Sequence, residues 1–456
     1  MTPPPRPTPG VSRAYAFPVV ERATLSNGIR VAVARMPRLP LVAVQAVADK
    51  GASTEARGTE GIAQLTSRTM REGTTRLDGA VLTEQLEMLG TGLDLESDWD
   101  STGLQLTVTS SRLEAATSLL GELWTSPGFR ENDVARLRAE RLAEILQLTA
   151  EPRGLADEKF SEFLYEAGSR YALPAGGTAK SVRGLGRSGI RAFHAANYSP
   201  DTTRLVFVGD VTIERAVPLV EAALGMWRGA TRSRDAPAAD MATRVRRVEV
   251  VNKTDAPQSE LRVGHRGVPR RHPEYFSILV MNALLGGLFS SRINMNLRER
   301  NAFTYGAHSA FDWRVGAGPF VVSTAVKTEV TAEATGEILR EITRFREETV
   351  GTDELTLATA YLGGVFPIRY ETIQAVAEAI AMLDTYDLGH DYFDRYRDRV
   401  RSVTSDEVRR AAEAHLHPDE LLVLAVGDAG AIRGPLEHLA LGPVKVHDVD
   451  DEGAVS

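Results

Sequence analysis

Residues 61–74 read Gly-Ile-Ala-Gln-Leu-Thr-Ser-Arg-Thr-Met-Arg-Glu-Gly-Thr and follow a strand-like stretch that ends at Glu55. Positions four apart lie on one face of a helix, so Gln64 and Arg68 share a face, and Ser67 lies beside them. An amide is a feeble metal ligand, a guanidinium is a permanent cation, and a hydroxyl is no general base near neutral pH. The chain contains no His-x-x-Glu-His and no His-x-x-His. This helix therefore carries no zinc chemistry.

The same stretch resembles the zinc-binding helix of the M16 metallopeptidases, the pitrilysin- and insulinase-like family, in its M16B type. That helix carries an inverted motif, Gly-x-Ala-His-x-x-Glu-His, which ends in Gly-Thr. The matching positions are Gly61, Ala63, Gly73 and Thr74. The resemblance places the two metal-binding histidines at Gln64 and Arg68, and the glutamate that takes a proton from zinc-bound water at Ser67. It implies that the scaffold is kept and the zinc site is degenerate, so we expect no metal or other cofactor in this chain.

The resemblance also implies a third ligand, a glutamate on a later helix. Glu144 lies 76 positions after Arg68, in a segment, 131–149, whose apolar residues recur at helical spacing. On spacing alone, a solvated helix charge is the favoured interpretation of Glu144, and only the resemblance favours a ligand position. We predict that Arg68 takes the place of the zinc and pairs with Glu144 within about 4 Å, because an unpaired buried carboxylate is costly.

Residues 284–305 contain Gly-Gly, Ser-Arg and Leu-Arg-Glu in succession, followed by a tyrosine. This order resembles the signature of the C-terminal domain of M16 proteins. In the family an arginine and a tyrosine seven positions apart hold the substrate backbone and the oxyanion, and the pair falls on Arg298 and Tyr305. A guanidinium suits a peptide carbonyl or carboxylate, and a phenol can donate to an oxyanion. Without the resemblance, Arg298 reads as a helix ion pair with a neighbouring glutamate, and Tyr305 as a half-buried strand residue.

Length and composition indicate a soluble globular protein of more than one domain. The chain has 456 residues, of which 43% are hydrophobic and 25% are charged. Its net charge of −8 and pI near 5.7 argue against non-specific binding of nucleic acid. It has no cysteine, no signal-peptide core at its N-terminus and no apolar run of membrane-spanning length. We expect a cytoplasmic protein without a nucleic-acid or membrane partner.

The chain also repeats itself. Pro200-Asp201 precedes an apolar stretch that ends in Gly209-Asp210, and Pro418-Asp419 precedes one that ends in Gly427-Asp428; both anchors are 218 positions apart. A shared offset at two anchors indicates a duplication. Both halves mix short strands with long helices, which predicts an α+β fold with helices packed on mainly antiparallel sheets. The resemblance implies two such domains that face each other across a cavity.

The predicted boundaries follow the composition. We expect an N-terminal domain over 15–228, a linker over 229–245 that lacks apolar periodicity, and a C-terminal domain over 246–440. The Pro-rich residues 1–14 are expected to be extended, and the acidic residues 441–456 to form a mobile tail.

The function hypothesis combines the lost zinc motif with the retained pair. We interpret the chain as the non-catalytic subunit of a heterodimeric M16B peptidase, in which a zinc-bearing sister subunit cleaves unfolded peptides and this chain supplies Arg298 and Tyr305. One alternative is a scaffold like the core proteins that resemble this family in respiratory complexes. Another is a peptide-binding chamber that works alone as a homodimer.

Overall fold

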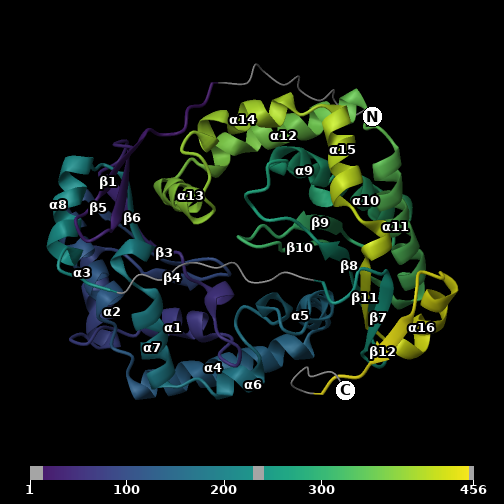
Figure 1. The fold of residues 1–456 in the computed structure, drawn as a ribbon, viewed down its shortest axis with the longest axis horizontal. Helices are drawn as coiled ribbons and strands as arrows, with labels where there is room; N and C mark the ends of the chain where they lie inside the picture. The colour runs from purple at the N-terminus through teal and green to yellow at the C-terminus, as the bar shows by residue number, and fades with distance from the viewer. Residues whose placement is uncertain (1–13, 230–240, 451–456) are drawn as a thin grey trace, which may run out of the picture.

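The computed structural model describes residues 14–229 and 241–450, which form two halves, each built on one six-stranded sheet (Figure 1). The first sheet has the order β1-β2-β6-β3-β5-β4 and the second the order β12-β7-β11-β8-β10-β9. The first-sheet strands are β1 (Val20–Thr24), β2 (Arg30–Arg35), β3 (Leu41–Ala48), β4 (Asp94–Ser97), β5 (Thr102–Thr109) and β6 (Thr203–Gly209). The second-sheet strands are β7 (Arg247–Asn252), β8 (Gln258–Arg266), β9 (Ala307–Phe311), β10 (Pro319–Lys327), β11 (Leu422–Gly427) and β12 (Val444–His447).

The sheets are mixed, since β2 pairs parallel with β6, and β7 pairs parallel with β11 and β12, while the other neighbours are antiparallel. The first half holds α1 (Ile62–Met70), α2 (Gly79–Leu89), α3 (Leu113–Thr125), α4 (Glu131–Ala150), α5 (Pro152–Leu164), α6 (Ala179–Arg183), α7 (Arg187–Asn197) and α8 (Ile213–Leu224). The second holds α9 (Tyr275–Asn282), α10 (Arg292–Asn294), α11 (Thr331–Glu347), α12 (Thr352–Arg369), α13 (Ile373–Thr385), α14 (Tyr392–Ser402), α15 (Ser405–His415) and α16 (Ala429–His438), with π-helical segments at Ala283–Gly287 and Met295–Arg300. The α+β fold class predicted from the sequence is confirmed.

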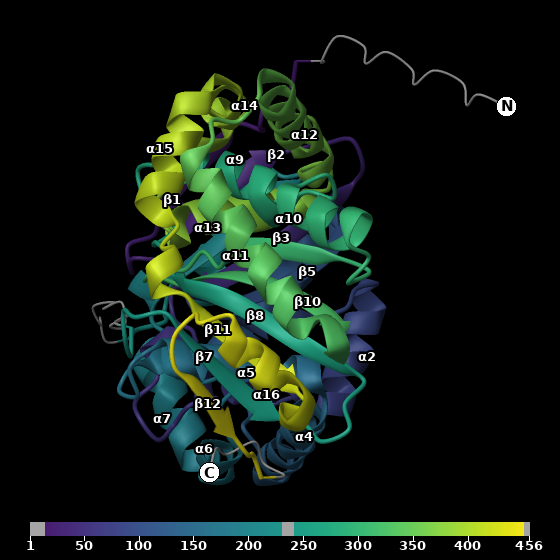
Figure 2. The same cartoon turned by 90° about the vertical axis from the view of Figure 1, so that its right-hand side faces the viewer.

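The duplication is visible in the order of the strands. From β2 to β4 the first sheet has the same neighbours and the same strand directions as the second sheet from β7 to β9. The helices agree with this, because α15 begins and ends 218 positions after α7. Figure 2 shows α11 and α16 over the outer side of the second sheet, and α11 contacts β8 while α16 contacts β7.

The inner face of each sheet is covered by a helix of the other half. Phe160 of α5 belongs to one buried cluster with Leu422 and Leu424 of the second sheet. In return, Ile380 of α13 lies in one core with Val206 of the first sheet. Figure 1 shows the exchange, with α13 beside β6 and α5 beside β8. Neither half therefore buries its own inner sheet face.

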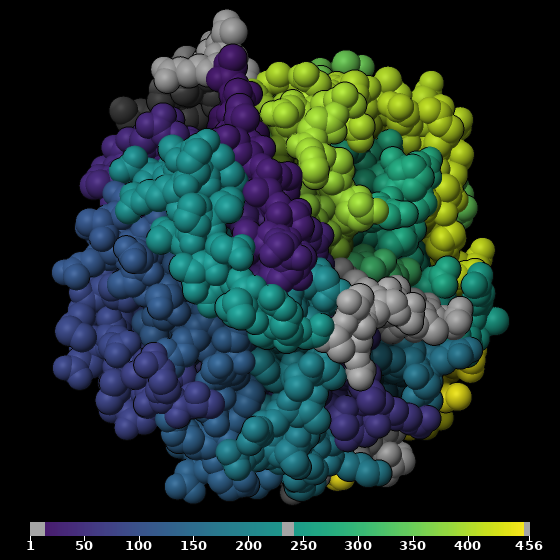
Figure 3. All heavy atoms as spheres, turned by 60° about the vertical axis from the view of Figure 1, so that its left-hand side comes forward, coloured from purple at the N-terminus to yellow at the C-terminus, as the bar shows by residue number. Residues whose placement is uncertain are grey.

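The start of the described chain also joins the halves. Phe17 stacks on Phe393 of α14 with ring centres 4.5 Å apart, and Arg22 pairs with Asp384 of α13 at 3.2 Å. In Figure 3 this purple segment runs alongside the yellow-green residues of the second half. An apolar and an ionic contact thus attach the start of the described chain to α13 and α14 of the second half.

The C-terminal tail departs from the prediction for 441–456, because Val444–His447 forms the edge strand β12. The open edge of β7 supplies backbone partners for it, and His447 contacts Glu249 at 2.7 Å and stacks on Phe163. Residues 451–456, 1–13 and most of the expected linker, 230–240, lie outside the described residues.

One helical run in the described chain, Tyr275–Arg300, is long and apolar enough to cross a membrane. More than half of its most apolar window is buried inside the protein. Ile278, Met281 and Leu285 belong to the core of the second half. The run therefore has the burial pattern of a core helix in a soluble protein.

Candidate functional site

The helix of the degenerate zinc motif, α1, starts from a tightly fixed N-terminus. Gly61 has φ 91°, and a Cβ added there would lie 2.6 Å from the carbonyl oxygen of Gly176, so only glycine fits. The carboxylate of Glu55, which is fully buried, accepts the backbone N–H groups of Gly61 and Ala63 at 3.0 and 2.8 Å. Arg170 donates to the same carboxylate at 2.7 Å. A buried ion pair thus holds the helix start, where four backbone donors lack partners inside the helix.

The predicted pair of Arg68 and Glu144 is confirmed. An Nη1 hydrogen of Arg68 is donated to Oε1 of Glu144 at 2.7 Å. Arg141 donates to the other oxygen, Oε2, at 3.1 Å and to the carbonyl of Gly176 at 3.0 Å. The hydrogen bond from Arg68 is the main cause that lowers the pKa of Glu144. The guanidinium groups of Arg68 and Arg141 therefore bind the two oxygens of the carboxylate that the resemblance assigns to zinc.

The remaining positions of the motif also do not fit a zinc ion. Ser67 donates its hydroxyl to the backbone carbonyl of Gln64 at 2.9 Å, inside the helix. The side-chain oxygen of Gln64 is buried and has no hydrogen-bond partner among the described residues. One amide oxygen and a carboxylate bound by two cations are a poor donor set for zinc, which prefers imidazole, thiolate and free carboxylate. The chemistry of the site therefore disagrees with zinc binding.

Elsewhere in the described chain, one group of side chains could hold a metal ion. His272, Glu274 and His415 bring one ligand atom each within 4.8 Å of one another. A hydrogen bond of 2.7 Å joins His415 to Glu274. The group lies in the second half, where α15 ends beside the start of α9, so it does not replace the motif on α1.

The second predicted pair has mixed surroundings. The guanidinium of Arg298 lies 3.5 Å from Glu299 and 4.5 Å from the ring centre of Phe289, so the ion pair with a neighbouring glutamate is present. Tyr305 is 95% exposed, because it lies in the loop before β9, and it is no half-buried strand residue. Among the described residues, no hydrogen bond joins these two side chains, and their role in a partner's active site stays a prediction.

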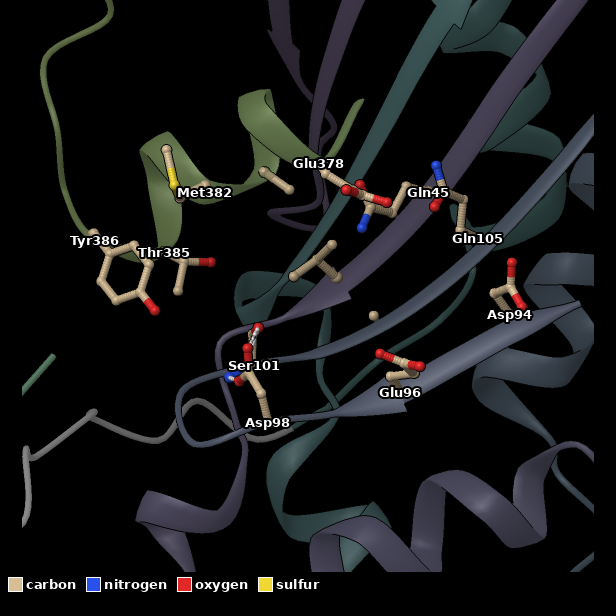
Figure 4. Close-up of a pocket in the computed structure, with 13 residues that line it drawn as sticks. Gln45, Asp94, Glu96, Asp98, Ser101, Gln105, Glu378, Met382, Thr385 and Tyr386 are labelled. Carbon is tan, nitrogen blue, oxygen red and sulfur yellow. Dashed lines mark hydrogen bonds between the residues drawn. The ribbon is translucent and has the colours of Figure 1, made fainter. Parts of the chain in front are cut away.

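An acidic pocket lies between the halves, at the edge of the first sheet. It has a volume of about 470 Å³ and lies between β3, β4 and β5 on one side and α13 on the other (Figure 4). Its acidic residues are Asp94 and Glu96 on β4, Asp98 in the turn after it, and Glu378 on α13. Asp98 is already engaged, since it accepts the backbone N–H groups of Asp100 and Ser101.

The other acidic groups repel one another. Burial raises the pKa of Glu378, and the negative charges of Glu96 and Asp94 raise it further. None of these three carboxylates has an ion-pair partner among the described residues. Gln45 of β3 lies at the base of the pocket, 9% exposed, and its Oε1 has no hydrogen-bond partner in the described chain. The pocket therefore offers acceptors in excess of donors.

The sequence reasoning missed this pocket, although part of its signal was present. Asp94 and Glu96 alternate with Leu95, which is buried in the core of the first half. In a strand this alternation sends both acids to the same face. The partner residue Glu378 is 282 positions beyond Glu96, and nothing in the local pattern places α13 over that face.

A second pocket, of about 180 Å³, occupies the corresponding place on the second sheet. It lies beside β8, β9 and β10, and α5 contributes Arg153 to its wall. Arg262 pairs there with Asp157 at 2.6 Å and with Glu260 at 2.8 Å. Burial and then the charges of Arg262 and Arg153 lower the pKa of His308. Tyr305 also lines this pocket, so the predicted tyrosine faces a site with mixed charge.

A duplicated α+β chain with a degenerate zinc helix is the architecture of one class of peptidase-related proteins. The model of the insulinase family, peptidase family M16, matches residues 30–174, and the model of the peptidase M16 inactive domain matches residues 185–362. The chain belongs to the M16 peptidase family.

Relatives and solved structures agree with this assignment. The chain is 23% identical over 404 residues to an uncharacterized zinc protease of Streptomyces coelicolor, covering 87% of each chain. Its fold is similar to that of a peptidase M16 inactive domain from Pseudomonas fluorescens, with a TM-score of 0.84, 22% identity, and coverage of 90% of this chain and 98% of that one. It is also similar to a chain of complex III2 from Candida albicans, with a TM-score of 0.77, 16% identity, and coverage of 92% and 100%.

Proposed function

We propose that this chain is the non-catalytic subunit of a heterodimeric M16B peptidase that acts in the cytoplasm. A sister subunit with an intact motif binds the zinc and cleaves unfolded peptides, while this chain supplies one half of the chamber and two substrate-binding side chains. The proposal rests on one observation: the carboxylate of Glu144 accepts hydrogen bonds from both Arg68 and Arg141. A carboxylate held by two cations favours loss of zinc in this chain.

The surroundings of Arg298 and Tyr305 support a role toward a bound peptide. The phenol of Tyr305 is exposed, so it is available to donate a hydrogen bond to the oxyanion that forms during peptide cleavage. The guanidinium of Arg298 is 35% exposed and rests against Phe289. Its ion pair with Glu299 is long, at 3.5 Å, so donors remain for a peptide carbonyl or carboxylate.

The test is reconstitution with the M16 chain of the same organism that carries an intact zinc motif. Cleavage of an unstructured peptide should appear in the mixture and be absent from this chain alone. Tyr305→Phe should lower kcat/KM of the mixture on the order of 10²–10³-fold, the usual effect of losing one oxyanion donor. Arg298→Ala should have a similar or smaller effect, without loss of assembly.

A matched control is Tyr361→Phe, which removes the hydroxyl of another exposed tyrosine, on α12. It should leave the rate unchanged. If Tyr305→Phe and Arg298→Ala both assemble with the sister subunit and the mixtures cleave at the wild-type rate, the pair has no catalytic role.

That outcome would favour a scaffold, a second candidate that the similarity to a complex III2 chain supports. Co-purification of a sister chain from the native host would favour the heterodimer over a homodimer that binds peptides alone.

A further inference from the structure

We propose that His272, Glu274 and His415 form a binding site for a divalent transition-metal ion such as Zn²⁺. The three side chains bring one ligand atom each within 4.8 Å of one another. Glu274 is the residue before α9 and His415 is the last residue of α15, and in Figure 1 both helices lie in the second half, across the molecule from α1. The site is therefore separate from the degenerate zinc motif, and the inference does not depend on the proposed function.

The set of donor atoms fits a transition metal. Two imidazoles and one carboxylate are preferred ligands of Zn²⁺, whereas Mg²⁺ and Ca²⁺ prefer oxygen ligands alone. Ligand atoms at about 2.0–2.2 Å from one zinc ion lie no more than about 4.4 Å apart. The side chain of Glu274 is 47% exposed, so a small rotation brings the three atoms to that spacing. Three protein ligands leave a position open for water.

The backbone holds each ligand in place before an ion binds. The N–H of His272 donates to the carbonyl of Pro269 at 3.0 Å, and the carbonyl of His272 accepts the N–H of Tyr275 at 3.1 Å. Glu274 is fixed as the N-cap residue of α9, and His415 ends α15 with its side chain only 11% exposed. Ligands that are ordered in advance lose little conformational freedom on binding, which favours affinity.

Metal binding replaces two hydrogen bonds. Nε2 of His415 lies 2.7 Å from Oε2 of Glu274, and Nδ1 of His272 accepts the backbone N–H of Glu274 at 3.2 Å. The second bond is at the long end of the usual range. Whichever ring nitrogen of His272 binds the ion, this bond is lost, because a neutral imidazole has one acceptor nitrogen. Three bonds to the metal take the place of these two contacts.

The carboxylate of Glu274 is not held by arginine, in contrast to the carboxylate of the degenerate motif. Among the described residues its ion-pair partner is His415, which is itself a ligand of the proposed site. Arg271 pairs with Asp387, and Arg270 donates to a tyrosine hydroxyl of α14 at 2.7 Å. The end of α15 favours a cation and the start of α9 disfavours one. These two effects oppose each other, so the ligand atoms decide the affinity.

The sequence predicted no metal in this chain, because the ligands are far apart along it. Glu274 and His415 are 141 positions apart, and their spacing matches no zinc motif. The fold brings them together, since α15 packs against α9 (Figure 2).

The test is calorimetric titration of the full chain with Zn²⁺, on protein made without a histidine tag, with metal analysis after dialysis. One Zn²⁺ per chain should bind. His272→Ala, Glu274→Gln and His415→Ala should each weaken binding at least about tenfold, because even groups that only orient a ligand alter metal affinity by about 10–100-fold. Excess Mg²⁺ should not displace the Zn²⁺, since it prefers oxygen ligands.

A matched control is His390→Ala together with His438→Ala, which removes two exposed imidazoles elsewhere and should keep the affinity. Glu274→Gln changes a half-exposed side chain, so it tests the site even if the histidine variants fold poorly. Because the ion binds the folded chain, Zn²⁺ should raise the Tm of the wild type and of the control more than that of Glu274→Gln.

The inference is overturned if no equivalent of Zn²⁺ binds, if the three single variants bind it as tightly as the wild type, or if excess Mg²⁺ displaces it. Glu144→Gln separates this site from the motif on α1 and should leave the affinity unchanged. A loss of Zn²⁺ binding in Glu144→Gln would place the ion at α1 and would also overturn the inference.

Discussion

The pockets beside α13 and beside α5 occupy corresponding places on two sheets of the same topology, yet their charges differ. The first is acidic, with Asp94, Glu96 and Glu378, while the second contains Arg153 and a histidine whose pKa is lowered by neighbouring arginines. The strand order and directions that define the repeat are shared. Sheet positions on the inner faces that lie outside the area covered by α5 or α13 are not needed for the core. Their side chains could therefore diverge without loss of the fold.

The helices α5 and α13, which cover the inner faces of the two sheets, should contribute similarly to the free energy of unfolding. Phe160→Ala and Ile380→Ala each remove a side chain buried between one half's helix and the other half's sheet. Each should lower the free energy of unfolding by about 2–5 kcal/mol. Urea denaturation followed by circular dichroism measures this, with the exposed Leu357→Ala on α12 as the control, expected within about 0.5 kcal/mol of wild type. A large loss in only one helix would break the equivalence.

The degenerate zinc site differs from the family motif in more than the three replaced positions of α1, Gln64, Ser67 and Arg68. The combination Gln64→His, Ser67→Glu and Arg68→His restores the residue types, but Arg141 still binds Glu144 and the carbonyl of Gly176. We expect weak zinc binding and little peptidase activity. Adding Arg141→Ala should strengthen zinc binding, because it frees the Glu144 carboxylate from a competing cation; the change should be on the order of 10–100-fold, the scale on which groups around a ligand alter metal affinity.

Competition against a chromophoric zinc chelator measures these affinities. The same combination with Glu144→Gln controls for ligation by that carboxylate. Strong turnover by the first combination alone would mean that the site is nearly intact.

Arg68→Ala removes the ion pair that distinguishes this helix. Because the pair is partly exposed, the stability at neutral pH should fall by only about 0.2–1 kcal/mol. The pKa of Glu144 is lowered in the folded protein. The ion pair therefore stabilises the folded protein fully above the ordinary carboxyl pKa. This stabilisation is lost as the pH falls through the lowered pKa of Glu144. The difference in stability between variant and wild type should therefore be larger at pH 7 than at pH 3. An equal difference at both would contradict an ionic role.

Glu378→Gln tests the acidic pocket, and its expected effect on stability is the smallest of these predictions. The folded-state pKa of Glu378 is raised, so its ionisation costs stability as the pH rises from the ordinary carboxyl value through the raised one. The variant should gain a few tenths of a kcal/mol at pH 7, because the group is partly solvated, and should match wild type at pH 4. Lower stability of the variant at pH 7 would show that the charge has a favourable partner.

Local patterns in the sequence predicted the elements well. The helical spacing of apolar residues over 131–149 corresponds to α4, Glu131–Ala150, and the Arg68–Glu144 pair followed from the resemblance to the M16 zinc site. The acidic pocket could not be predicted, because it depends on α13 crossing to the other half. The strand β12 was missed because its two valines are too few to mark a strand, and the free edge of β7 is what orders them.

The exchange of α5 and α13 has a consequence for synthesis on the ribosome. The first sheet is complete once β6 has emerged, but Ile380, which covers Val206 on its inner face, is made 174 residues later. During that interval the growing chain presents an apolar surface that its own first half cannot cover, and such surfaces favour aggregation. The first half should therefore be most prone to aggregation in the interval before α13 leaves the ribosome.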